Sequence, residues 1–155
     1  MTATGARDAS TLLNGLIEIC KDGEEGFRTA ATGIHDSTLR RLLESYAHQR
    51  AGFAQELQAE VARLRDEPAG SGDTAGALHR GWMKIRQAIS GNDEAAILAE
   101  CERGEEAAVR AYREAVDRDI AGDAGTVVER QYLQVKDAHD HVRMLERTEA
   151  GESRS

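Results

Sequence analysis

The sequence has few of the residues that interrupt helices or fill the core of a β-sheet. Only one of its 155 residues is proline, Pro68, and only six are aromatic. A β-sandwich or barrel of this length normally has more aromatic and β-branched residues and more residues typical of turns. The composition therefore argues against a β-rich fold and favours helices.

The sequence also lacks the features of membrane, secreted and nucleic-acid-binding proteins. It has no apolar run long enough to cross a membrane, and residues 1–10 are too polar for a signal peptide. Lys and Arg total 20 against 28 Asp and Glu, a net charge of −8, whereas nucleic acids and anionic membranes attract a positive surface. Cys20 and Cys101 form neither a CxxC pair nor a zinc-ligand spacing. We expect a cytoplasmic protein with two buried free thiols, which binds neither nucleic acid nor membranes.

The hydrophobic periodicity predicts one domain of four long helices, with a shorter helix between the second and third. The long helices are expected at residues 12–34, 38–65, 93–119 and 126–148, and the shorter one at 74–89. Asp36 or Ser37 is the expected cap of the second helix. The domain is expected to span residues 10–148, with disordered tails at 1–9 and 149–155.

The lengths of the connections predict how these helices are arranged. The first and second helices are joined by a short link, as are the third and fourth, so each pair should form an antiparallel hairpin. The connection between the hairpins is long, and we expect Trp82 to anchor its short helix on the bundle. Two hairpins joined by a long crossover are typical of a ferritin-like four-helix bundle, which is the fold that we predict.

Each long helix places one ionisable residue within its apolar face on a helical wheel. These positions lie at similar depths from the helix ends, so together they predict one polar layer at mid-bundle. The layer consists of Glu24, Arg50, Glu105 and His139, and it is lined by Tyr46, Tyr112 and Tyr132. Glu102 is predicted at the margin of its apolar face, and His141 is predicted to point away from the core.

Two interpretations of this layer are open, because charges in a core must neutralise one another or bind something. Arg50 and a protonated His139 can balance Glu24 and Glu105, which predicts a salt-bridge layer without a cofactor. Alternatively, Glu24, Glu105 and His139 bind iron or manganese, because carboxylates and imidazole are the metal ligands of helical bundles. The usual di-iron set, with a Glu-x-x-His motif on each of two helices, is incomplete here, and the positive charge of Arg50 opposes a metal.

No catalytic residues are predicted, since the sequence has no nucleophile elbow, phosphate-binding glycine loop or dinucleotide fingerprint. We therefore expect a non-enzymatic bundle that serves in binding, assembly or stress physiology. The alternative is a metal-storage protein or a metal-dependent oxidoreductase. Glycines within the helices, such as Gly15, Gly23, Gly26 and Gly104, indicate close helix contacts in the bundle or between chains. We expect a homodimer or another small homo-oligomer.

Several segments resemble one bacterial family of ferritin-like bundle proteins, the domain of unknown function 2383. They are residues 13–18 and 20–27, Gln49-Arg50 with Phe53 and Glu56-Leu57, and residues 76–82 and 99–105. The resemblance extends over about residues 12–147. It implies a ferritin-like fold and a cytoplasmic bacterial protein, and it implies no particular activity.

Overall fold

The computed structural model describes residues 6–64 and 82–154, and within these ranges the chain is helical with no strand. The helices are α1 (Ala6–Thr32), α2 (Ser37–Arg63), α3 (Ile85–Ser90), α4 (Glu94–Asp117) and α5 (Gly122–Arg154). The prediction of an all-helical chain is confirmed for these residues. None of these helices is long and apolar enough to cross a membrane.

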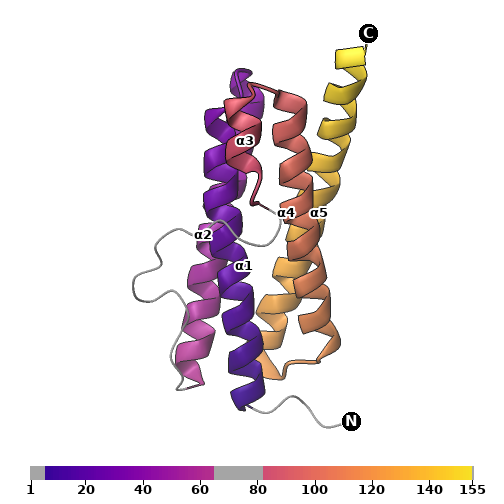
Figure 1. Ribbon diagram of the computed structural model, residues 1–155. Coiled ribbons are helices and arrows are strands. Elements are labelled where there is room, and N and C mark those ends of the chain that lie inside the picture. The colour runs from indigo at the N-terminus through magenta and orange to yellow at the C-terminus, as the bar shows by residue number, and fades with distance from the viewer. Residues whose placement is uncertain (1–5, 65–81, 155) are drawn as a thin grey trace.

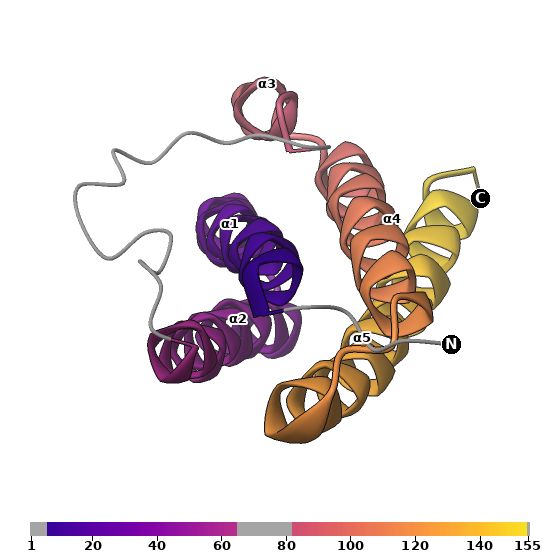
Figure 2. The ribbon, with the colours of Figure 1, turned by 90° about the horizontal axis from the view of Figure 1, so that it is seen from below.

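The four long helices form two antiparallel hairpins that pack against each other (Figure 1). α1 pairs with α2, and α4 pairs with α5; α1 then packs against α4, and α2 against α5. The short helix α3 lies over α1 and α4 at one end of the bundle (Figures 1 and 2). One half of the seam between α1 and α4 therefore has a third helix over it.

Two aspartates fix the start of a helix in each hairpin. Asp36 precedes α2, and its carboxylate accepts a hydrogen bond from the backbone N–H of Leu39 at 2.9 Å. Asp93 precedes α4 and accepts in the same way from Ala96 at 3.2 Å. Such caps satisfy backbone donors that have no partner within the helix, and the predicted cap at Asp36 is confirmed.

The structure corrects several predicted helix bounds. α1 begins at Ala6 and α5 continues to Arg154, so residues 6–9 and 149–154, expected in disordered tails, are helical. Ala9 and Ser10 are buried against the bundle, which explains the earlier start of α1. Residues 149–154 contain no proline and are mostly good helix formers. The short helix is six residues long, and residues 74–81 of its predicted range lie outside the described residues.

The apolar core consists of two clusters, one toward each end of the bundle. The first includes Leu13, Ile17, Phe53, Leu57, Ala108, Tyr112 and Val135. The second includes Phe27, Leu43, Ala47, Trp82, Ile97, Cys101 and Val142. Along α2, Arg50 lies between the two sets, and Glu105 does so along α4. A polar level thus separates two apolar halves.

Candidate functional site

Arg50 and Glu105 form a buried ion pair between α2 and α4. Their side chains are 1% and 0% exposed. The guanidinium donates from Nη1 to Glu105 Oε1 at 2.6 Å and from Nη2 to Oε2 at 2.9 Å. Burial alone would lower the pKa of Arg50, but the charge and hydrogen bonds of Glu105 raise it above its ordinary value. The two groups therefore neutralise each other, and two members of the predicted layer lie together in the core.

At the level of the Arg50–Glu105 pair, α1 contributes no side chain to the core, because its inward-facing residue is Gly23. A Cβ added at Gly23 would lie 3.4 Å from Nη1 of Arg50, so the guanidinium occupies the space that Gly23 leaves. Glu24 instead lies at the surface, 22% exposed, and accepts from Arg28 Nη2 at 2.8 Å. The prediction that Glu24 belongs to the buried layer is wrong, because Gly23, and not Glu24, is the residue of α1 that faces Arg50.

His139 faces the seam between α4 and α5, so it does not meet the Arg50–Glu105 pair. Its side chain is 13% exposed, and Nδ1 lies 3.1 Å from Asp140 Oδ1. The other ring nitrogen, Nε2, is buried and has no hydrogen-bond partner among the described residues. The predicted metal set of Glu24, Glu105 and His139 does not fit a metal, because its members lie apart and Arg50 binds both carboxylate oxygens of Glu105.

A different set of possible ligands meets at that seam. Glu102 and Glu106, one turn apart on α4, each place a carboxylate oxygen close to a ring nitrogen of His139 on α5. The three ligand atoms all lie within 4.8 Å of one another. The (i, i+4) spacing of the two glutamates was visible in the sequence, but the seam was not, since it depends on how α4 and α5 face each other.

Negative charge predominates at this cluster. Burial raises the pKa of Glu102 above its ordinary value, and the neighbouring carboxylates of Glu146 and Glu106 raise it further. Arg143 and His139 act in the opposite direction, and the Arg143 Nε atom lies 3.6 Å from Glu102 Oε1. The cluster therefore has a net attraction for positive charge.

The three predicted tyrosines have different surroundings. The Tyr112 hydroxyl is buried, lies 3.0 Å from Cys20 Sγ and donates to Gln131 Oε1 at 2.7 Å. Tyr46 is half-buried, and its hydroxyl lies 2.9 Å from Nδ1 of His141, so His141 does not point away as predicted. Tyr132 is partly buried against the first apolar cluster, and its hydroxyl accepts from Arg113 Nε at 3.4 Å and not from the Arg50–Glu105 pair, which differs from the expectation that it lines the layer.

The comparison with known families matches most of the chain. The family described as a domain of unknown function, DUF2383, matches residues 8–118, which run from α1 through α4. The chain belongs to the DUF2383 family. The match includes Arg50, Glu105, Glu102 and Glu106 and ends before α5, so it is shorter than the resemblance expected to residue 147. A comparison with curated proteins gives no match.

Beside the ion pair, this DUF2383 chain keeps two free thiols in its core. Cys20 and Cys101 are both buried, as predicted. Burial raises the pKa of Cys20 to about 11, against the lowering effect of the hydrogen bond to Tyr112. Burial and the nearby carboxylate of Glu105 raise the pKa of Cys101 well above its ordinary value. Because the thiolate is the reactive form, neither thiol is suited to nucleophilic chemistry.

The ring of Trp82 occupies the space that two glycines leave between the helices. A Cβ added at Gly26 or Gly104 would lie 2.2 Å and 2.1 Å, respectively, from ring atoms of Trp82. The ring also packs edge-on against Phe27, with centroids 5.0 Å apart. The prediction that Trp82 anchors the connection on the bundle is confirmed.

Proposed function

We propose that this protein is a non-enzymatic, ferritin-like bundle that binds a divalent transition-metal ion at the seam of α4 and α5. Glu102, Glu106 and His139 would hold the ion. Two observations carry the proposal: the buried Nε2 of His139 has no hydrogen-bond partner among the described residues, and a ring nitrogen of His139 lies within 4.8 Å of carboxylate oxygens of Glu102 and Glu106. A metal ion would give that nitrogen a partner.

The chemistry of the donor set favours certain ions. A neutral imidazole with carboxylates suits Mn²⁺, Fe²⁺ or Zn²⁺, whereas Mg²⁺ and Ca²⁺ prefer oxygen ligands alone. Ligand atoms about 2.1 Å from an ion lie about 3.4 Å apart in a tetrahedral site. The present separations of up to 4.8 Å therefore require a small movement, which the exposed Glu106 side chain is free to make. The raised pKa of Glu102 supports the proposal, because a cation would offset the repulsion among its neighbours.

The bundle core supports binding as the role in preference to catalysis. Arg50 and Glu105 satisfy each other, and the two thiols are held in their protonated form. The arrangement of two hairpins, with α3 in the connection between them, supports the ferritin-like relationship. Buried free thiols support a reducing compartment, and we propose the cytoplasm on that basis.

The test is a titration of the metal-free, tag-free protein with Mn²⁺ and Zn²⁺ by isothermal calorimetry. We expect one ion per chain, with an affinity that falls as the pH is lowered, because metal ligands bind in their deprotonated forms. His139→Gln and Glu102→Gln should each weaken binding at least tenfold, as expected for the loss of a ligand. His48→Gln is the matched control, since His48 is exposed on α2. Unchanged binding in folded His139→Gln would overturn the proposal.

A further inference from the structure

The second half of the seam between α1 and α4 forms an open groove. The groove has a volume of about 670 Å³, and Leu12, Leu16, Ala107 and Ala111 are among its lining residues. At the other half of the same seam, Trp82 and α3 lie over the two helices. Within residues 6–64 and 82–154, no helix lies over the open half in this way. Gly15 widens the groove, because no atom lies within 4 Å of a Cβ built there.

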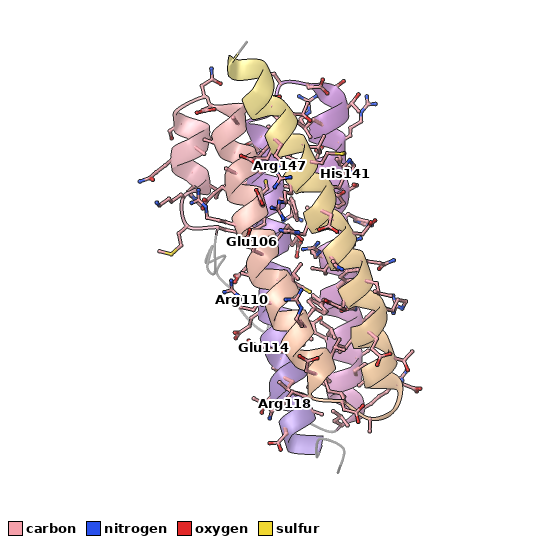
Figure 3. All side chains as sticks on the ribbon, turned by 90° about the vertical axis from the view of Figure 1, so that its right-hand side faces the viewer. Glu106, Arg110, Glu114, Arg118, His141 and Arg147 are labelled. Carbon is pink, nitrogen blue, oxygen red and sulfur yellow. The ribbon has the colours of Figure 1, made fainter. Side chains whose placement is uncertain are left out.

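The outer face of α4 beside this groove carries a row of alternating charges. Arg103, Glu106, Arg110 and Glu114 are all exposed and follow one another at spacings of three or four residues. Figure 3 shows Glu106, Arg110 and Glu114 in sequence along this face of the helix. Residues at these spacings lie on one side of a helix. Ala107 lies within the row, where its small side chain permits a close approach by another helix.

This row is complementary to itself when two copies of α4 run antiparallel. Arg103 then lies opposite the partner's Glu114, and Glu106 lies opposite the partner's Arg110. A two-fold axis repeats each pair, which gives four pairs of opposite charge and none of like charge. In the same register, Arg110 crosses the partner's Ala107, so the longest side chains of one helix lie over the smallest of the other.

We propose that the groove between α1 and α4 binds a second copy of this chain, with the two α4 helices antiparallel about a two-fold axis. The charge row sets the register, and the apolar lining at Leu12, Leu16 and Ala111 supplies the area that is removed from water. Since exposed charge pairs are screened by salt, the dimer weakens as ionic strength rises. The proposed dimer does not require the proposed metal site, although Glu106 belongs to both.

The experiment is sedimentation of the full chain over a range of micromolar concentrations in a chelating buffer, which removes any contribution of bound metal. We expect the wild type to be a dimer, and Ala107→Arg to raise the dimer Kd at least tenfold by placing bulk and charge at the contact. The matched control is Ala51→Arg, at a partly exposed alanine on α2, which should leave the Kd unchanged. A monomeric wild type would overturn the proposal, as would a dimer that Ala107→Arg leaves intact.

A charge exchange tests the register itself. Glu114→Arg places two like-charged pairs opposite Arg103, and Arg103→Glu does the same opposite Glu114, so each variant alone should be at least tenfold weaker as a dimer. An equimolar mixture of the two should dimerise again, because both cross-pairs regain opposite charges. Arg103 also forms an ion pair with Glu100 at 2.8 Å, which Arg103→Glu removes. Recovery of the dimer in the mixture would show that losing this ion pair has not unfolded the chain. Two variants that each weaken the dimer but fail to recover when mixed would refute this register, whereas binding of metal to such variants would remain a separate result.

Discussion

Breaking the Arg50–Glu105 pair is expected to cost this protein a large part of its stability. Arg50→Leu leaves a carboxylate that is 0% exposed without its two charge-assisted hydrogen bonds. Removing one partner of a buried pair costs about 3–5 kcal/mol, because the other charge stays in the core uncompensated. For a chain of this length, about 4 kcal/mol corresponds to a fall in Tm of about 8–16 °C. Thermal unfolding followed by circular dichroism measures the change.

Four comparisons show whether burial is the cause. Arg28→Leu removes an exposed partner of Glu24, and such surface pairs are worth about 1 kcal/mol or less. Replacing both Arg50 and Glu105 with leucine should recover much of the loss, because no unpaired charge remains. The penalty for Arg50→Leu should shrink from pH 8 to pH 5, since protonation neutralises the stranded carboxylate. Glu105→Gln should show no such relief, because the guanidinium keeps its charge. An Arg50→Leu variant no less stable than Arg28→Leu would refute the reasoning.

The other predictions concern the core around this pair. Gly104→Ala places a Cβ 2.1 Å from the Trp82 ring and should cost about 1–3 kcal/mol of unfolding free energy through overpacking. In a Trp82→Ala background the same change should be almost neutral, and additive losses in denaturant melts would contradict the contact. Burial raises the pKa of Cys20 to about 11, so the folded chain keeps a proton that the unfolded chain loses near pH 9. Stability should therefore fall from pH 9 to pH 11, with a smaller fall in Cys20→Ala, and an unchanged slope would argue against the shift.

The helices and half of the polar layer could be predicted from the sequence, because both follow from the period of the apolar residues. Arg50 and Glu105 each lie within an unbroken apolar stripe, and a position surrounded by core residues on its own helix is buried. The cap at Asp36 was equally local, since it needs only the backbone of the next turn. In each case the neighbours along the chain determine the outcome.

Glu24 and His139 could not be placed in this way, because their surroundings depend on other helices. A wheel drawn from hydropathy gives little weight to glycine, so it missed Gly23 as the residue that faces Arg50. It also cannot distinguish the axis of a bundle from a seam between two neighbours. His139 lies within the apolar stripe of α5 and still meets α4 at Glu102 and Glu106. The contact between Tyr46 and His141 was missed for the same reason.

The ion pair, the proposed metal site and the proposed dimer contact all use one stretch of α4, and Glu106 is shared by the last two. Glu105 faces the core, Glu102 and Glu106 face α5, and Arg103 lies on the outer face beside the groove. Consecutive residues of a helix diverge by about 100°, so neighbours in sequence serve different contacts. Because Arg50 already neutralises Glu105, no charged residue on the faces toward α5 or the groove is needed to balance a charge in the core. Effects on metal affinity, dimer Kd and unfolding free energy should therefore be separable. Glu102→Gln should lower the metal affinity and leave the dimer intact. Arg103→Glu should weaken the dimer and leave the metal affinity within a factor of about three.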